Sequence, residues 1–212
     1  MTASLLGFLL GLKHALEADH LAAVAALAAD EVSPWGMVRQ AFYWALGHSL
    51  MLLLVAGSLL ALGATLAPQL SAALETAVGV VLVVLGLRLV LRNSRWGTRW
   101  QPALAAGADV TPTVRDSRPA LLIGMLHGTA GSAVLILITM QASQSFGHAV
   151  GYIALFGLGS IAGMLCVSGV LALPLRELRR NPKHWPLLER VLGAATVVVG
   201  LMLALSTISG GS

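Results

Sequence analysis

A cluster of metal-type side chains lies near the start of the chain, in the run His14-Ala-Leu-Glu17-Ala-Asp19-His20. Imidazole nitrogens and carboxylate oxygens together suit a divalent transition metal. The flanking sequence is apolar over a length that could cross a membrane, and ionisable side chains in such segments are costly and rarely present without a function. The cluster therefore indicates a buried metal site, and in a membrane protein it points first to the passage of an ion.

The composition places the chain in the membrane class. Of its 212 residues, 57% are hydrophobic and only 10% are charged, whereas a soluble domain carries about 25% charged residues. The single cysteine, Cys166, excludes an internal disulfide and a cysteine-based zinc site. A pI of about 10.0 could suggest a nucleic-acid partner, but the cations fall in short loops between apolar segments, where topology explains them. We therefore expect a lipid bilayer, and no nucleic acid, as partner.

Apolar runs of about 20 residues or more predict six membrane helices. The expected spans are 4–28, 38–65, 71–92, 119–142, 145–173 and 188–208. The polar segment between the third and fourth spans contains Gly, Pro and Thr and is expected to form a loop. The prediction is an all-α polytopic membrane protein with a first three-helix unit, a cytoplasmic loop and a second three-helix unit, at 1–92, 93–118 and 119–212.

The cations predict an orientation. Lys13 lies inside the first expected span, and the other twelve lysines and arginines lie in or beside the loops that follow the first, third and fifth spans. Cytoplasmic loops carry an excess of Lys and Arg. We therefore expect a multi-pass protein of the plasma membrane, the bacterial inner membrane, with these loops in the cytoplasm and both termini outside.

The second half of the chain echoes the first. Each unit holds an odd number of spans, so two such units must have opposite orientations, as a 3+3 inverted repeat. Inverted repeats are common in transporters, where the site lies near the midplane between the halves. Three markers recur in the same order: Gly11 and His14 with Gly124 and His127, Gly47-His48 with Gly147-His148, and Leu74-Glu75, Gly79 and Gly86 with Leu188-Glu189, Gly193 and Gly200.

The geometry of a regular helix would separate the clustered side chains. At 100° per residue, Asp19 lies about 140° and His20 about 240° around the helix from His14. One metal could collect all three only if the helix unwinds locally, which is tolerated where a membrane helix lines a cavity. Otherwise one of them, for instance Asp19, orients an imidazole. A buried hydrogen-bond network that holds no metal is the remaining alternative.

Further candidates come from depth and spacing. His48 and His127 reach depths close to that of His14, whereas His148 is shallower. Lys13 and Glu17 are four residues apart and are expected to neutralise each other, and Glu75 and Glu189 are expected to open their helices at the positive end of the dipole. We predict the metal ligands to be His14, Asp19, His20, His48 and His127. Candidates for a gate or for supporting contacts are Lys13, Glu17, Thr129, Ser132 and His148.

Three stretches resemble motifs of the nickel/cobalt transporter family. His14 to His20 is similar to its H-x4-D-H signature, Leu46-Gly-His48-Ser49 to its Leu-Gly-His-Ser motif, and the stretch from Gly124 to Ser132 to one in the urease-accessory branch. The resemblance implies a site in the membrane helices that moves Ni²⁺ or Co²⁺. It implies roles for His14, Asp19, His20 and His48. Typical members have eight helices and Asp-Thr motifs in a later helix, where this chain has His127-Gly-Thr129.

The expected function is therefore secondary transport of Ni²⁺ or Co²⁺, with the ion as substrate and no prosthetic group. The chain contains no nucleotide-binding motif, so a gradient, the membrane potential or a partner would supply the energy. A homo-oligomer or a metalloenzyme assembly system is a possible partner.

Other functions stay open at this point. Related six-helix families export anions such as sulfite, and a metal sensor or an assembly partner for a urease or hydrogenase system would not transport at all. The pair His14 and Asp19 also fits the H-x4-D motif of glycerolipid acyltransferases. Those enzymes need a downstream substrate-binding block that is missing here, so we expect no enzymatic activity.

Overall fold

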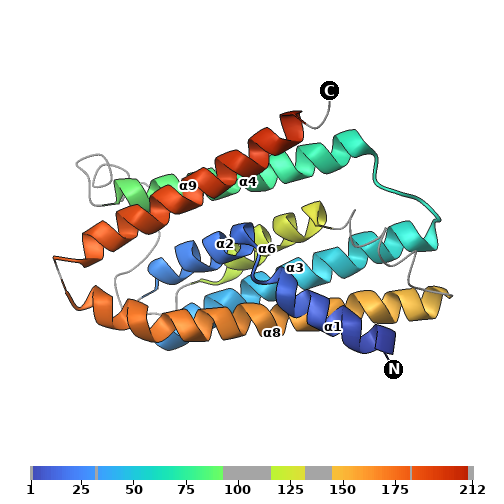
Figure 1. The fold of residues 1–212 in the computed structure, drawn as a ribbon, viewed down its shortest axis with the longest axis horizontal. Helices are drawn as coiled ribbons and strands as arrows, with labels where there is room; N and C mark the ends of the chain where they lie inside the picture. The colour runs from blue at the N-terminus through green and yellow to red at the C-terminus, as the bar shows by residue number, and fades with distance from the viewer. Residues whose placement is uncertain (1, 32, 93–115, 132–144, 182, 210–212) are drawn as a thin grey trace.

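The computed structural model describes residues 2–31, 33–92, 116–131, 145–181 and 183–209. This part of the chain is all helical. Figure 1 shows three tiers, with α4 and α9 on one side, α2 and α6 in the middle, and α1, α3 and α8 on the other side. The helices are α1 (Thr2–His14), α2 (Ala18–Ala29), α3 (Pro34–Ala61), α4 (Pro68–Leu91), α6 (Arg118–Ala130), α8 (Phe146–Arg179) and α9 (Trp185–Ser209).

The predicted all-α fold is confirmed, and four of the helices, α3, α4, α8 and α9, are long and apolar enough to cross a membrane. They match four of the six expected spans. The expected span 4–28 is instead divided into two short helices, α1 and α2. The expected span 119–142 begins as α6, but its remainder from residue 132 lies outside the described residues.

The division between α1 and α2 follows from a tightened turn. Leu16 N–H donates to Lys13 O at 2.9 Å and Glu17 N–H to His14 O at 3.0 Å, so the last turn of α1 closes on i→i+3 bonds. Glu17 is then extended, and α2 starts at Ala18. The charges suit this break, because α1 ends on Lys13 and His14 whereas the first turn of α2 carries Asp19.

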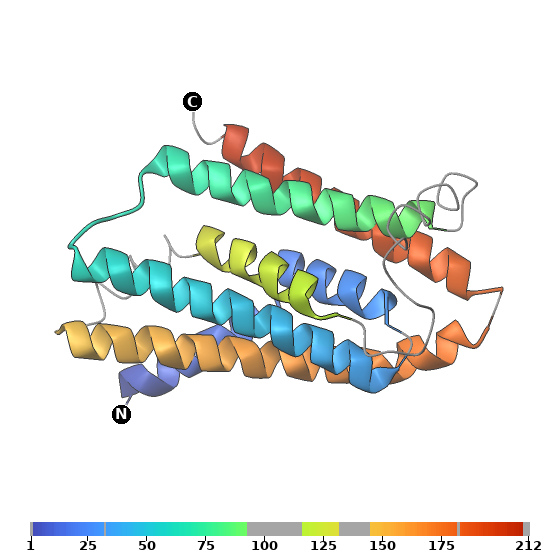
Figure 2. The same cartoon turned by 180° about the vertical axis from the view of Figure 1, so that it is seen from behind.

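Close backbone contact joins the helix pairs. A Cβ added to Gly79 of α4 would lie 2.6 Å from Gly200 O of α9, and one added to Gly86 would lie 2.5 Å from Gly193 O. Glycines make the same kind of contact between α1 and α8 and between α3 and α6, and Figure 2 shows α6 lying along α3. Small residues are used in this way where helices pack in lipid.

A charged network ties four helices together at one end of the bundle. Asp30, which caps the C-terminus of α2, lies 3.3 Å from Arg88 and 3.2 Å from Arg92 of α4. Arg92 also lies 3.4 Å from Glu189 of α9, a carboxylate that is 1% exposed. Arg179 of α8 donates to the carbonyl of Ala29. The end of α2 is thereby held between both halves of the chain.

Glu75 and Glu189 do not lie in the first turns of their helices, where they were expected. The helices start at Pro68 and Trp185, earlier than the hydropathy of the sequence suggested. Glu75 consequently lies in the third turn of α4 and Glu189 in the second turn of α9, too far in to complement the first-turn dipole. Glu189 is instead the partner of Arg92.

The α4–α9 crossing should be intolerant of a single added methyl group. We expect Gly86→Ala to lower the free energy of unfolding by about 1–3 kcal/mol, as overpacking does, because its Cβ would collide with backbone atoms of α9. Gly57→Ala is the matched control, since a Cβ there meets nothing within 4 Å. Thermal unfolding in detergent measures both variants, and equal midpoints would contradict the close crossing.

Candidate metal centre

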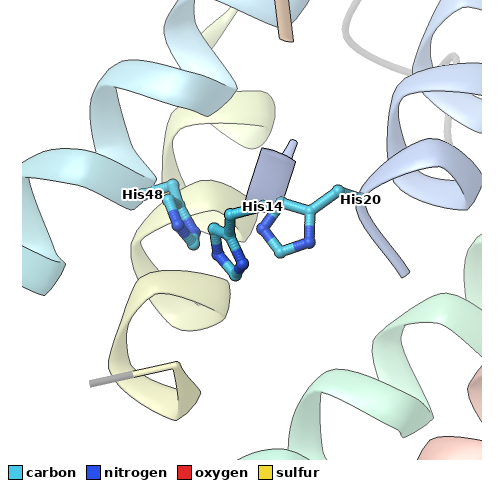
Figure 3. Close-up of side chains that lie close together, drawn as sticks. All are labelled: His14, His20 and His48. Atoms are coloured by element: carbon cyan, nitrogen blue, oxygen red, sulfur yellow. The ribbon is translucent and has the colours of Figure 1, made fainter. Parts of the chain in front are cut away.

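Four histidines from four helices converge in the middle of the bundle. His14 ends α1, His20 lies in the first turn of α2, and His48 and His127 come from α3 and α6. The ring centroid of His20 is 4.1 Å from that of His14, 5.0 Å from that of His48 and 4.5 Å from that of His127. Figure 3 shows His14, His20 and His48 with their rings grouped together.

The helix break makes this convergence possible. A continuous helix would turn His20 about 240° away from His14, whereas the extended Glu17 resets the direction of the chain and brings the two rings side by side. The local unwinding that a shared site required is therefore present. His20, His48 and His127 are buried, and the side chain of His14 is 15% exposed.

The potential ligand atoms are nearly close enough to share one ion. Two groups have all their ligand atoms within 4.8 Å of one another, namely His14 with His20 and His48, and Asp19 with His20 and His127. A metal lies about 2.1 Å from an imidazole nitrogen, so two ligands of one ion are at most about 4.2 Å apart. A small inward movement of the side chains would satisfy this limit.

Two carboxylates hold three of the imidazoles. Asp19 Oδ1 accepts from His20 Nδ1 at 3.0 Å, and Asp19 Oδ2 accepts from His127 Nε2 at 2.8 Å. Glu17 Oε2 lies 3.0 Å from His14 Nδ1. The expected pairing of Glu17 with Lys13 is wrong for the described residues, because the break removes Glu17 from the helical register that an i,i+4 pair needs.

Several buried nitrogens of the cluster have no partner. Within the part of the chain that the structure describes, His14 Nε2, His20 Nε2 and both ring nitrogens of His48 are buried without a hydrogen bond. Buried polar atoms are nearly always paired. Four unpaired nitrogens on three adjacent rings therefore suit an added polar guest, such as a metal ion or water.

A cavity of about 440 Å³ lies against the cluster. Since a water molecule occupies about 30 Å³ of liquid, the cavity has room for an ion with several waters. Glu75 of α4 is part of the cavity wall, a position that no pattern in the sequence indicates. The wall is lined by the four histidines and by Lys13, Glu17, Asp19, Glu75, Tyr152 and Phe156, among others.

Sequence reasoning also missed Trp44. It is fully buried, and its ring centroid lies 5.5 Å from that of His20, 5.4 Å from that of His127 and 6.1 Å from that of His48. The indole therefore covers one side of the imidazole cluster. Its position four residues before His48, on the same face of α3, was the available signal.

The remaining candidates lie elsewhere or make local contacts. His148 is exposed at the start of α8, where its Nδ1 lies 2.7 Å from Ser145 Oγ, and it does not line the cavity. Thr129 Oγ1 donates to Leu126 O of its own helix at 2.6 Å. Ser132 lies outside the described residues. Of the candidates for a gate or a supporting contact, Lys13 and Glu17 do line the cavity.

Trp44 offers an optical test of the geometry. A paramagnetic ion such as Co²⁺ held among the imidazoles would lie near the indole and quench its fluorescence. We expect saturable quenching that Trp44→Phe removes and Trp35→Phe retains, since Trp35 is 74% exposed on the surface. Circular dichroism checks that both variants are folded, and a saturable component of equal size in both would place the ion elsewhere.

Comparisons with known proteins identify the family of this chain. The chain is similar to "Urease accessory protein UreH" of Bacillus sp. (strain TB-90), with 28% identity over 199 residues that cover 92% of this chain and 87% of the relative. No solved structure matches the chain. The family model described as NicO, high-affinity nickel-transport protein, matches residues 1–164, which include all four clustered histidines. The chain therefore belongs to the high-affinity nickel-transport family.

Proposed function

We propose that this protein carries a divalent transition metal ion, Ni²⁺ or Co²⁺, across the membrane through a centre built from His14, Asp19, His20, His48 and His127. The observation that carries the proposal is the group of unpaired, buried imidazole nitrogens beside a cavity in an apolar bundle. Imidazole suits Ni²⁺ and Co²⁺, whereas Mg²⁺ and Ca²⁺ prefer oxygen ligands. Family membership supports nickel as the cargo.

We infer further that 1–92 and 119–212 form two oppositely oriented three-helix units. The repeat equates Gly79 with Gly193 and Gly86 with Gly200. The packing supports this. If each glycine is replaced by its counterpart in the other unit, the contact of Gly79 with Gly200 becomes the contact of Gly193 with Gly86, and both contacts are present. Contacts between helices of different units would have this property if a two-fold axis related the units.

The packing indicates a different alignment for one part of that repeat. The expected match of Gly47 with Gly147 does not agree with the packing of the two glycines, because a Cβ on Gly147 would meet nothing within 4 Å. Gly47 instead packs on the carbonyl of Leu121 of α6 as Gly159 packs on that of Phe8 of α1.

Leu46-Gly47-His48 therefore corresponds to Leu158-Gly159-Ser160, and His48 has the buried Ser160 as its counterpart. His14 and His127 stay matched. The second unit thus contributes a single imidazole, from His127, to a centre supplied mainly by the first.

Transport would then follow from rocking of the two units about this centre. The ion exchanges its water for imidazole in the middle of the bundle, and opening to the other side releases it. In the proposed orientation the cation-rich loops face the cytoplasm, with the start of α1 and the end of α9 at the outer end (Figure 1). The relative's name mentions urease, and we propose a nickel-enzyme assembly system as the destination of the cargo.

Proteoliposomes loaded with a metal-sensitive dye test transport directly. We expect saturable Ni²⁺ flux that falls at least about tenfold in His20→Ala, because even residues that only support a metal ligand are worth 10–100-fold. His184→Ala is the matched control, since His184 is exposed in the turn before α9. The proposal fails if no flux occurs in either direction, or if both variants transport as well as the wild type.

Acidity should inhibit the same flux. Imidazole binds a metal only when it is neutral, so protons compete with the ion and transport should fall as the pH drops below about 6. The measurement uses equal pH on both sides of the vesicle membrane, so that no proton gradient contributes. Because burial disfavours the charged form of an imidazole, the decisive range extends to lower pH, and a flux that stays constant from about pH 7.5 to about pH 4 would argue against imidazole ligands.

A further inference from the structure

We propose that Glu17 and Asp19 are positioning residues, which fix the hydrogen on His14 and His20 so that only imidazole nitrogens bind the ion. The ligand atoms are then His14 Nε2, His20 Nε2 and one ring nitrogen of His48. This inference rests on the proposed function and assigns different tasks to residues that would otherwise all count as ligands.

Glu17 determines which nitrogen of His14 is available. A neutral imidazole carries one N–H and one lone pair. A carboxylate oxygen is an acceptor, so the nitrogen that faces Glu17 Oε2 at 3.0 Å, Nδ1, carries the hydrogen. The lone pair is therefore on His14 Nε2, which is buried and has no hydrogen-bond partner among the described residues.

Asp19 determines which nitrogen of His20 is available, and both of its carboxylate oxygens accept hydrogen bonds from imidazoles. Its Oδ1 accepts from His20 Nδ1 at 3.0 Å, which leaves the lone pair on the buried and unpartnered His20 Nε2. Its Oδ2 accepts from His127 Nε2 at 2.8 Å. Both carboxylate oxygens are thus occupied by imidazole hydrogens, and Asp19 could bind the ion only by giving up one of these bonds.

The three available nitrogens belong to one group. His14, His20 and His48 form one of the two groups whose ligand atoms lie within 4.8 Å of one another, and Figure 3 shows their rings side by side. Metal-bound histidines usually donate their second N–H to a carboxylate or carbonyl, which fixes the ring and raises its basicity. Glu17 and Asp19 already make these contacts before any ion is bound.

An all-imidazole ligand set narrows the class of ion. Nitrogen ligands favour borderline metals such as Ni²⁺, Co²⁺, Cu²⁺ and Zn²⁺ over the oxygen-seeking Mg²⁺, Ca²⁺ and Mn²⁺. The carboxylate oxygens Glu17 Oε2, Asp19 Oδ1 and Asp19 Oδ2, which would attract the harder ions, are engaged by imidazole. Discrimination against abundant Mg²⁺ would then come from hydrogen bonding around the ligands.

Isosteric amides separate positioning from coordination. The amide oxygen of Glu17→Gln still accepts the His14 hydrogen, so we expect its Ni²⁺ dissociation constant to stay within about threefold of the wild-type value. Glu17→Ala accepts nothing and should bind about 10–100-fold more weakly. Calorimetry on the full chain in detergent measures both. An equal loss in the two variants would overturn the positioning role.

X-ray absorption at the nickel edge gives a second, spectroscopic readout. We expect three imidazoles around Ni²⁺ in the wild type, in Glu17→Gln and in Asp19→Asn, but two in His14→Ala. A carboxylate ligand that disappears in Asp19→Asn or Glu17→Gln would overturn the inference and leave the proposed function standing. A wild-type chain that binds no Ni²⁺ would overturn the proposed function as well.

Discussion

The interruption between α1 and α2 is the constraint on which the rest of the site depends. Without it, His14 and His20 would project from different sides of one helix and could not share one ion. The break leaves helix ends in the interior of an apolar bundle, which is tolerated in membrane proteins only where protein or a cavity surrounds them. Here α8 packs against both α1 and α2, α3 packs against α2, and His127 of α6 bonds to Asp19 just after the break. The cavity lies against the same region.

Asp19 links the two halves of the chain through the site itself. Its side chain begins in α2, and it bonds to His127 of α6 as well as to its neighbour His20. A single carboxylate therefore connects His20 in the first half to His127 in the second half by hydrogen bonds. Other polar contacts also join the halves, because Ser49 donates to Gly157 O at 3.1 Å and Thr76 Oγ1 lies 2.8 Å from Thr207 Oγ1. The network of Arg92 with Glu189 joins them at the end of the bundle.

The sequence was sufficient for the fold class, for four long helices and for most members of the cluster. Long apolar runs can only be helical in lipid, and costly polar residues within them mark a site. Spacing alone could not show that the chain would turn at Glu17, although Lys13 and His14 before the break and Asp19 after it were suited to two helix ends. The expected Lys13–Glu17 pair was wrong for that reason.

Other features depended on how helices pack against each other. Trp44 and Glu75 look like ordinary helix residues in the sequence, and only the approach of α3 and α4 to α2 brings them to the cluster and the cavity. The match of Gly47 with Gly147 rested on the neighbouring histidines, whereas the packing aligns Gly47 with Gly159. The contacts of each glycine therefore identify its counterpart in the other unit better than the histidine that follows it.

The close glycine contacts between α4 and α9 have a mechanical consequence. Where side chains interdigitate, two helices can change their angle only by lifting ridges out of grooves. At Gly79 and Gly86 of α4 and at Gly193 and Gly200 of α9, backbone lies against backbone, and side chains such as Leu89, Val90 and Val197 flank the contact. Because the two contact points are seven residues apart, about 10 Å along each helix axis, a change of crossing angle would drive backbone into backbone at one of them, and α4 and α9 are expected to move as one rigid unit.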